Sequence, residues 1–454
     1  MDDIEPRPPR ALSRRRFVGL AAGAGLLAGR PAAAESTPDV VGWVDRTAAP
    51  LRTAGAHGPL DDLQPLRRIV RDAHLVGLGY SAHGTHTQLT LQHRVIRFLV
   101  AHLGFRTVAW EESWGGGVVV DRYVTGGGDV DDADEVIGQA HVMLRSAAFL
   151  DLVRWLRAFN RGRPEHDKVR FLGADIVELR DLLADEITRY VAGVAPGRVP
   201  ELRGHLDPLR MRGNPQEHLA WYLDPARTED EKRELVAHAH AVHDLLRRLP
   251  HDDDVVQHAR ALIGFYDFYT QAGLAQDARD RYIAEFLESW RRRTGHRIVY
   301  CAHNAHTAAN PRMLTSTPDG RPGDDTRDRA LSGGMLRRRY GPRYVSIGTV
   351  FHRGQVLTGW ERPGGPSVFD VPAPHPSFVD HVLGQAREPD YLLDLNAGGP
   401  PEVRRWLAGP AKTRIISSAY VPADDTHYSQ TVDSWRAGFD AMLHVGRVAA
   451  TRLV

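Results

Sequence analysis

The sequence has little of several features that would narrow its class. Only one of its 454 residues is a cysteine, Cys301, so no disulfide can form within the chain. Its 58 basic and 57 acidic residues leave a formal net charge of +1. That balance gives no argument for a nucleic-acid partner or for an anionic surface. There is also no internal repeat and no long low-complexity tract. Since 42% of the residues are hydrophobic, the chain can build a large core, in one large domain or in several smaller ones.

Residues 1–34 have the features of a targeting segment. A basic leader contains Ser13-Arg14-Arg15-Arg16-Phe17-Val18, a weakly apolar run covers Gly19–Leu27, and Ala32-Ala33-Ala34 offers an A-x-A cleavage site before Glu35. This order predicts a twin-arginine export signal, and a disordered basic tail is the alternative. The apolar run is too short to span a bilayer, and no cysteine near the cleavage site could carry a lipid. We therefore expect a secreted protein of residues 35–454 without a stable membrane anchor.

The rest of the chain alternates short apolar runs with helical patterns, which predicts an α/β domain over residues 35–454. We expect a central, mostly parallel sheet flanked by helices, and a helical insertion at about residues 177–293 that covers the cleft. Within the insertion, Thr228–Glu231 is a capping box at the start of a helix. The predicted strands are Leu75–Leu78, Thr107–Trp110, Val169–Leu172, Arg297–Cys301 and Tyr344–Gly348. Nearer the C-terminus we expect a surface loop at 318–328, a strand at Arg414–Ser417 and a final helix at Ser434–His444.

Polar side chains follow four of these strands at the point where each strand ends. In parallel α/β sheets, ligands bind beyond the carboxyl ends of the strands. If the strands are neighbours, the groups after them converge in one cleft. A carboxylate from a neighbouring strand would fix the tautomer of a histidine and raise its basicity, which suits activation of water for attack on a carbonyl. The converging residues would be Tyr80, Ser81, His83, Glu111, Glu112, Asp175, His303 and His306.

Each of these residues also has a purely structural interpretation. A histidine in a loop is more often a surface or turn residue than a catalyst, and Asn304 could simply make an Asx turn. Glu111 could be an ordinary salt-bridge partner, and Asp175 could cap a helix. Their joint placement after strands favours a functional interpretation.

Two other kinds of site are less well supported. His83, Glu111, His303 and His306 are competent zinc ligands, but His303-Asn304-Ala305-His306 lacks the carboxylate of the H-E-x-x-H pattern. We therefore expect no metal and no other cofactor. Ser81 is a poor candidate for a nucleophile, because Gly79-Tyr80-Ser81-Ala82-His83 has His where the G-x-S-x-G elbow has Gly.

The motifs resemble those of the erythromycin esterase family, in their order and spacing from about Val70 to Gly354. Gly79–Gly84 is similar to the family's G-E-x-x-H-G segment, and Leu103-Gly104-Phe105 matches its L-G-F. Further matches are Trp110-Glu111 for a strand ending in Glu, Arg279–Glu285 for R-D-x-x-M-A-E, His303–His306 for H-N-x-H, and Tyr344–Gly354 for a later strand.

The resemblance implies an α/β core with a helical subdomain over the cleft. It implies metal-independent hydrolysis of ester bonds, macrolide lactones included, by water rather than through an acyl-enzyme. His83 matches the general base, Glu111 a carboxylate that orients or assists it, and His303 and His306 the histidines across the cleft. The residues expected to contact a small-molecule ester or lactone are Tyr80, Ser81, Gln92, Glu112 and Asp175.

Two positions depart from the pattern of the macrolide esterases. Tyr80 stands where the family has Glu, and Gln92 falls where those esterases have Arg. Losing both keeps the charge balance of the site, whereas losing one would leave a buried charge unpaired. Tyr80 is a poor base at neutral pH because the reference pKa of tyrosine is near ~10, and Gln92 could stabilise an oxyanion only as a neutral donor. Arg94 and His93 are the neighbouring side chains that could compensate.

Three functional hypotheses follow. The first is an exported hydrolase with His83 as base, Glu111 as its orienting carboxylate and His303 or His306 at the oxyanion. The second is a non-hydrolytic lyase, isomerase or cyclase of secondary metabolism with Tyr80 as general acid. The third is a non-catalytic protein that binds a small molecule. The sequence does not specify the substrate or the oligomeric state.

Overall fold

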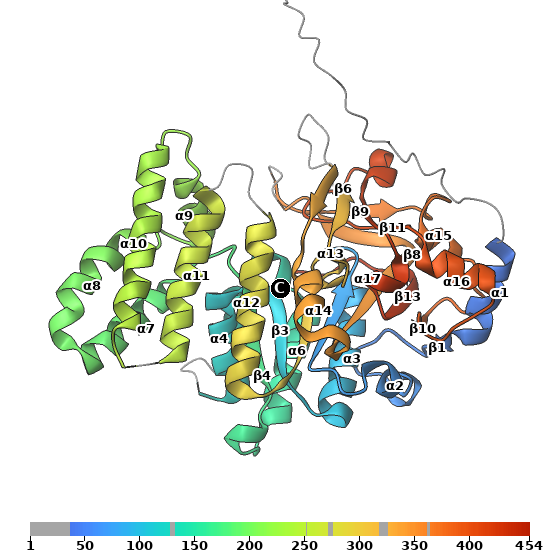
Figure 1. Cartoon of the computed structure of the whole chain (residues 1–454), viewed down its shortest axis with the longest axis horizontal. Coiled ribbons are helices and arrows are strands. Elements are labelled where there is room, and N and C mark those ends of the chain that lie inside the picture. Colours follow the sequence, from blue (N-terminus) through green and yellow to red (C-terminus); the bar gives the residue numbers. More distant parts are fainter. Residues whose placement is uncertain (1–36, 128–131, 251, 271–275, 317–325, 361–363) are drawn as a thin grey trace, which may run out of the picture. The chain divides into compact units, whose positions relative to one another are not determined.

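The computed structural model describes residues 37–454 except 128–131, 251, 271–275, 317–325 and 361–363 (Figure 1). The predicted export signal lies outside the described residues. In the described part of the chain, the main sheet has nine strands in the order β1-β10-β13-β8-β2-β5-β3-β4, with β9 paired to β8. The strands are β1 Ala49–Pro50, β2 Leu75–Tyr80, β3 Phe105–Ser113, β4 Arg170–Asp175, β5 Arg297–His303, β8 Tyr344–Thr358, β9 Ser367–Val371, β10 Tyr391–Asp394 and β13 Ala441–Val448.

The centre of this sheet is parallel and its margin is antiparallel. Each neighbouring pair from β13 through β8, β2, β5 and β3 to β4 is parallel. The strands β1, β9 and β10 pair antiparallel with their neighbours. The predicted α/β fold with a central, mostly parallel sheet is therefore confirmed.

Helices cover both faces of the sheet, as the burial of β5 shows. Val299 and Cys301 belong to one hydrophobic cluster, whereas Ile298 and Tyr300, which alternate with them, belong to the other. Strands buried on both faces have nearly continuous apolar sequences, which explains the short apolar runs. The longer helices on the sheet are α3 His86–Leu103, α4 Trp114–Thr125, α6 Ala147–Asn160, α12 Gln276–Thr294 and α14 Ser332–Tyr340.

A group of helices lies between β4 and β5 in the chain and beside the sheet in space (Figure 1). Its members are α7 Asp181–Val194, α8 Val199–Leu206, α9 Pro215–Tyr222, α10 Glu229–Arg247 and α11 Asp253–Thr270, with α12 following. The predicted capping box of α10 is present, because Thr228 and Glu231 each bond the other's backbone N–H. Helix α12 packs against β4 and β5 and thereby brings its first turns to the strand ends.

The C-terminal part differs most from the sequence prediction. The final helix expected at Ser434–His444 is wrong: α17 covers only Trp435–Gly438, and β13 enters the main sheet between β10 and β8. A short apolar run that is buried on all sides has no periodicity that separates strand from helix. The strand expected at Arg414–Ser417 is found three residues earlier, as β11 Ala411–Arg414.

β11 belongs to a second sheet. In the described residues this sheet has four antiparallel strands in the order β11-β12-β6-β7, with β12 at Ser429–Val432, β6 at Met313–Ser316 and β7 at Thr326–Arg329. The last residues of the surface loop predicted at 318–328 are therefore in β7, and 318–325 lie outside the described residues. The remaining helices are α1 Thr37–Thr47, α2 Leu66–Val70, α5 Ala133–Gly138, α13 Asn304–Thr307, α15 Val379–Leu383 and α16 Pro401–Ala408.

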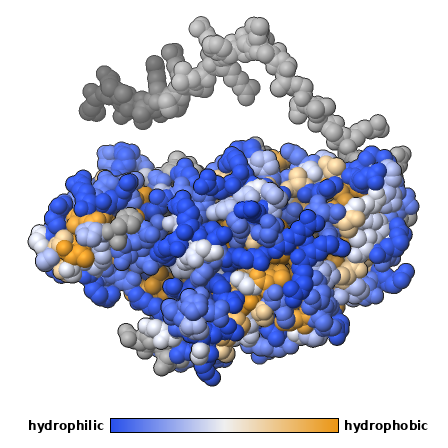
Figure 2. Space-filling view, turned by 60° about the horizontal axis from the view of Figure 1, so that its bottom comes forward, coloured by the Kyte–Doolittle hydropathy of each residue, from blue (hydrophilic) through white to orange (hydrophobic). Residues whose placement is uncertain are grey.

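Figure 2 shows a face that is mostly hydrophilic, with apolar residues in smaller patches. Within the described ranges, no helix combines the length and the apolar character needed to cross a bilayer.

Candidate active site

The sheet order brings the predicted site residues to one edge. Strands β2, β5, β3 and β4 are consecutive and parallel, so their carboxyl ends lie side by side. Tyr80 at the end of β2 is in register with His303 at the end of β5, and Ser113 of β3 with Asp175 of β4. Helix α12 closes the group from the other side with Arg279 and Asp280.

Glu111 is the centre of this group. Its Oε2 accepts hydrogen bonds from the Tyr80 hydroxyl and from the backbone N–H of His303, each at 2.9 Å. Its Oε1 lies 2.9 Å from Nη2 of Arg279 and 3.4 Å from Nε2 of His306. Burial alone would raise the pKa of Glu111, but the charges of His306 and Arg279 hold that pKa well below its usual range. Glu111 is therefore an ionised carboxylate, and both of its oxygens are engaged.

Arg279 joins Glu111 to Asp175, which is fully buried at the end of β4. Its Nε donates to Oδ1 of Asp175 at 3.0 Å, and its Nη2 donates to both carboxylates. Burial works against the charge of Arg279, but Asp175 and Glu111 raise its pKa well above the ordinary value. The planar guanidinium thus links two strand ends in a way that lysine could not reproduce.

His306 lies between two carboxylates. Its Nδ1–H donates to Oδ1 of Asp280 at 2.7 Å, and its Nε2 faces Glu111. Asp280 also accepts the backbone N–H of Ser332, at 2.8 Å. Burial favours the neutral ring, yet Asp280 and Glu111 together raise the pKa of His306 above its ordinary value. His306 therefore supplies positive charge to the site.

His303 differs from His306 in its protonation. Its Nε2 lies 3.2 Å from the carbonyl of Ser81, which can only accept, so Nε2 carries the hydrogen. Its Nδ1 accepts from the backbone N–H of Ala305 at 3.5 Å, as the N-cap of α13. Burial, and then the neighbouring His83, lower the pKa of His303 to about 3. His303 is thus a neutral ring whose Nε2–H holds the loop after β2 and whose Nδ1 caps α13.

His83 is the half-buried histidine of that loop. Its backbone N–H donates to the carbonyl of Ile416 at 3.0 Å, and its ring lies beside those of Tyr80 and His303. Burial lowers the pKa of His83 to about 4, although Glu111 acts in the opposite direction. A neutral imidazole at neutral pH has a lone pair that can accept a proton. No described residue is hydrogen-bonded to Nε2 of His83.

The loop that carries His83 is held on several sides. Gln88 accepts the backbone N–H of Ala82 and donates to the hydroxyl oxygen of Ser81 at 2.8 Å. Gly84 has a φ of 66°, and a side chain there would collide with the backbone of Leu357. The hydroxyl of Ser81 is thus part of the packing of the loop, in keeping with its poor match to a nucleophile elbow.

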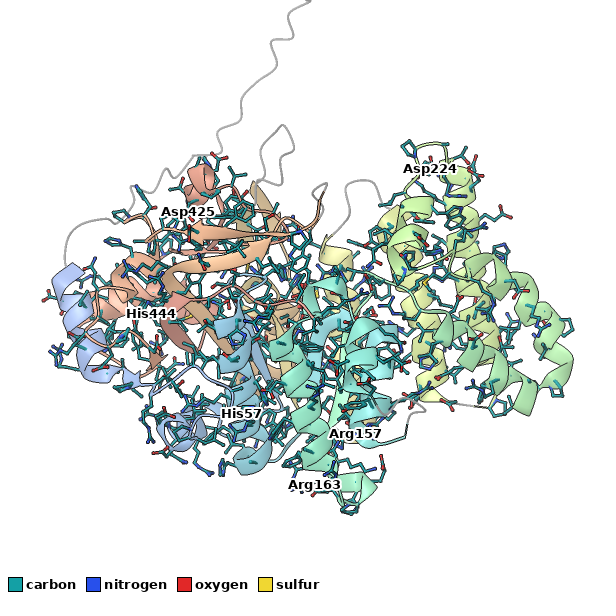
Figure 3. All side chains as sticks on the ribbon, turned by 180° about the vertical axis from the view of Figure 1, so that it is seen from behind. His57, Arg157, Arg163, Asp224, Asp425 and His444 are labelled. Atoms are coloured by element: carbon teal, nitrogen blue, oxygen red, sulfur yellow. The ribbon has the colours of Figure 1, made fainter. Side chains whose placement is uncertain are left out.

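Support from behind the loop comes from the second sheet. Ile416 exchanges backbone hydrogen bonds with Ser81 and His83, two residues after the buried Arg414. Arg414 donates to Oδ2 of Asp425 at 2.8 Å, and Figure 3 labels Asp425 in the C-terminal part of the molecule. A charge-assisted bond of this kind fixes the backbone on which the loop rests.

Some predicted site residues have other partners. Gln92 is fully buried and donates to the backbone carbonyl of Leu78 at 2.9 Å. Glu112 accepts from the backbone and hydroxyl of Ser113 and from the backbone N–H of His141. Burial raises the pKa of Glu112. The roles of Gln92 and Glu112 as substrate contacts remain predictions.

Neither Arg94 nor His93 replaces the missing guanidinium. Arg94 is ion-paired with Asp62 and bonded to the carbonyls of Thr53 and Pro59. His93 lies 3.4 Å from Asp151. The partners of both side chains lie outside the group around Glu111, so neither compensates for the missing guanidinium.

The sequence did not identify three residues of this region as site residues. Arg279 and Asp280 belong to the segment that resembles the family's R-D-x-x-M-A-E motif, and their adjacent opposite charges are the available sequence signal. His141 lies in a loop with no recognisable motif, where its Nε2 is 3.6 Å from Glu178. Burial lowers the pKa of His141. His141 in turn contributes to the lowered pKa of His83.

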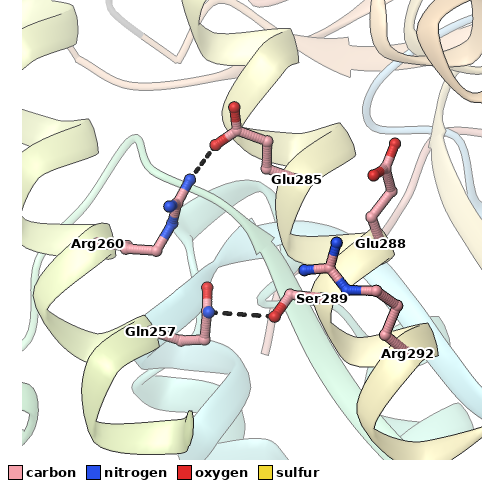
Figure 4. A pocket seen from close by; sticks show the side chains of 6 residues that line it. All are labelled: Gln257, Arg260, Glu285, Glu288, Ser289 and Arg292. Atoms are coloured by element: carbon pink, nitrogen blue, oxygen red, sulfur yellow. Dashed lines mark hydrogen bonds and ion pairs between the residues drawn. The ribbon is translucent and has the colours of Figure 1, made fainter. Parts of the chain in front are cut away.

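Another place where a ligand could bind lies apart from the group around Glu111. Across the residues that the structure describes, no set of three or more His, Cys, Asp or Glu side chains is arranged to hold a metal ion. A polar pocket of about 250 Å³ lies between α11 and α12 (Figure 4). It is lined by Gln257, Arg260, Glu285, Glu288, Ser289 and Arg292, none of which belongs to the group around Glu111.

A family model and a related protein of known name both indicate the same family. A family model described as Erythromycin esterase matches residues 100–448, a range that contains Glu111, His303 and His306 and begins after Tyr80 and His83. The erythromycin esterase type II of Escherichia coli is 30% identical over 135 residues, which are 30% of this chain and 31% of that protein. The match therefore spans about a third of that relative's length.

Two solved structures share the fold over nearly the whole chain. A Bacillus cereus protein has a TM-score of 0.77 at 22% identity, covering 93% of this chain and 100% of its own. A mutant of the erythromycin esterase EreC in an open conformation has a TM-score of 0.65 at 16% identity, covering 90% of this chain and 99% of its own. At these identities the likeness concerns the fold.

Proposed function

The chain belongs to the erythromycin esterase family, and on that premise we propose that it hydrolyses an ester or lactone bond of a small molecule, with His83 as general base. The observation that carries the proposal is the position of a neutral, half-buried histidine near the ionised carboxylate of Glu111, which two cationic side chains, Arg279 and His306, hold in place. General-base catalysis requires a ring that is unprotonated at the working pH. His83 meets that requirement because burial lowers its pKa to about 4.

The proposed step begins with a water molecule next to Nε2 of His83. The water oxygen attacks the carbonyl carbon while its proton moves to Nε2. The tetrahedral intermediate then releases the alkoxide as the ester C–O bond breaks, and the alkoxide takes the proton from His83. Glu111 favours the transient imidazolium, since its charge raises the pKa of His83.

The two other histidines receive different roles in this scheme. His306 carries positive charge and is the group proposed to stabilise the oxyanion. His303 is proposed to position the catalytic loop, because its Nε2–H is already donated to Ser81. The Tyr80 hydroxyl donates its hydrogen to Glu111, and burial raises the pKa of Tyr80 well above the ordinary value. A hydroxyl that releases its proton so reluctantly is a poor general acid, which disfavours the lyase or cyclase hypothesis.

The substrate class is proposed from chemistry and from the relatives. The name of the Escherichia coli relative points to a macrolide lactone, so macrolides are the first compounds to test, followed by smaller esters and lactones.

We also propose that residues 1–34 direct export by the twin-arginine route. Replacing both Arg14 and Arg15 with Lys should then keep the full-length protein in the cytoplasm, and unchanged secretion would refute export by this route.

The catalytic proposal is tested by hydrolysis in ¹⁸O-labelled water. Label should enter the carboxylic acid product, whereas a product without label would indicate a non-hydrolytic reaction. His83→Ala should lower kcat by about 10²- to 10⁴-fold without changing the circular dichroism spectrum. His102→Ala is the matched control, because His102 is exposed near the end of α3. Full activity of His83→Ala would exclude His83 as the base, and tight binding without turnover would indicate a binding protein.

A further inference from the structure

We propose that Tyr80 is a positioning residue that fixes the tautomer of His83, through a directed chain from Nδ1–H of His83 to Oη of Tyr80 and from the Tyr80 hydroxyl to Oε2 of Glu111. The inference rests on the proposed role of His83 as general base. It assigns to Tyr80 a different role from the substrate contact that the sequence predicted.

The direction of the chain follows from the one proton of the Tyr80 hydroxyl. Oε2 of Glu111 lies 2.9 Å from Oη of Tyr80. An ionised carboxylate only accepts hydrogen bonds, so Tyr80 is the donor of this pair. The cations Arg279 and His306 keep Glu111 ionised.

The second link is then determined by the first. Nδ1 of His83 lies 3.3 Å from the same Oη, whose proton is directed to Glu111. Only a lone pair of Oη faces the ring, so Nδ1 must carry the hydrogen. A neutral imidazole has one N–H, which leaves Nε2 with its lone pair and makes it the atom able to take a proton from water.

The reverse direction would disable the base. If Tyr80 donated to Nδ1 of His83, the ring hydrogen would lie on Nε2, and that atom could not accept a proton. Glu111 would also lose one of the two donors to Oε2. A histidine whose tautomer is fixed by a carboxylate is a recurring device of hydrolases, and here a tyrosine hydroxyl stands between the two groups.

The surroundings of Tyr80 hold its hydroxyl in this place. Its side chain is buried at the last residue of β2, in register with His303. Its ring makes edge contacts with His83 at 5.4 Å and with His303 at 5.6 Å between centroids. Because two rings confine the phenol, its hydroxyl reaches Glu111 and His83 together.

The test reads the tautomer directly and needs no substrate. Ring ¹⁵N chemical shifts of labelled histidine, with His83 assigned through a His83→Gln difference spectrum, should show His83 protonated on Nδ1. Tyr80→Phe should shift the ring toward the Nε2–H form and lower kcat by about 10²-fold with little change in KM. A 3-fluorotyrosine at position 80 keeps the hydroxyl and should restore both the tautomer and kcat.

Tyr344→Phe is the matched control. Tyr344 is buried in β8 and donates its hydroxyl to the carbonyl of Thr307, so its loss removes a buried hydrogen bond without touching His83. The proposal is overturned if wild-type His83 is protonated on Nε2, or if Tyr80→Phe leaves the tautomer unchanged. A tautomer that shifts in a protein without hydrolase activity would support the role of Tyr80 and refute the proposed function alone.

Discussion

Nδ1 of His306 lies 2.7 Å from Oδ1 of Asp280, although the two residues belong to different helices, α13 and α12. This contact joins the end of β5 to the helix that follows the insertion. It also decides the charge of the site, because Asp280 is the largest influence that keeps His306 protonated against burial. The proposed oxyanion partner thus depends on a residue that is not itself at a strand end.

Removing the negative charge of Asp280 should favour the neutral form of His306. In Asp280→Asn the pKa of His306 should fall, and the protein should lose about 3 kcal/mol of stability, since a buried ion pair is broken. Histidine NMR titration and urea unfolding measure the two effects. Asp277→Asn, at an exposed position of the same helix, should change neither. An unaltered His306 titration in Asp280→Asn would show that Asp280 does not control this charge.

His306 should also make stability depend on pH. Its folded pKa is raised above 6.5 by Asp280 and Glu111, while Arg279 acts in the opposite direction. The stabilisation it contributes is therefore complete below pH 6.5 and is lost as the pH rises through the folded pKa. The difference in unfolding free energy between wild type and His306→Gln should shrink above pH 6.5.

This difference isolates His306 from the two neutral histidines. His83 and His303 have lowered pKa values, so their effect has the other sign and appears as the pH falls below 6.5. A wild-type minus His306→Gln difference that stays constant from pH 6 to 9 would contradict the assignment of His306 as a cation.

On the acid side, activity should fall only in strongly acidic solution. His83 must be neutral to accept a proton, and its pKa is about 4. The value of kcat/KM should therefore be level between about pH 5 and 6.5 and decrease tenfold per pH unit below 4, provided that circular dichroism shows the fold intact. An acid limb near pH 6.5 would mean that burial does not depress the pKa of His83 in solution.

Arg279 should not be replaceable by lysine. Arg279→Lys loses the planar fork that bonds Asp175 and Glu111 together, and we expect a loss of about 2 kcal/mol in unfolding free energy. Arg281→Lys, at an exposed position two residues along α12, is the control and should be neutral. Equal stability of the two variants would show that a point charge at residue 279 is sufficient.

Gly84 should tolerate no side chain. Its φ of 66° is left-handed, and a Cβ there would overlap the backbone of Leu357, so Gly84→Ala should cost more than about 2 kcal/mol. Gly104→Ala meets open space at a similar φ of 71° and should cost only about 1 kcal/mol. Thermal unfolding of both variants provides the comparison, and similar losses would argue against crowding at residue 84.

The strand ends were predictable because burial on both faces leaves local signals. Apolar runs before Tyr80, Glu111, Asp175 and His303 identified the central strands, and the general rule for parallel sheets placed their carboxyl ends together. β13 was not predicted, although it is as buried as the central strands. Its apolar run is fully buried, but no flanking signal separated it from a helix.

The sequence by itself determined the α/β class, the four strand ends and the family motifs, since each depends on local periodicity or on a short fixed spacing. Only the tertiary structure decided which residues share a hydrogen bond. The pairing of β2 with β5 and the packing of α12 brought Tyr80, Arg279 and Asp280 to Glu111 and His306 over gaps of more than a hundred residues in some pairs. Protonation depends on burial and on neighbours within a few ångströms, so the charge on His306 and the neutral state of His83 are properties of the folded chain.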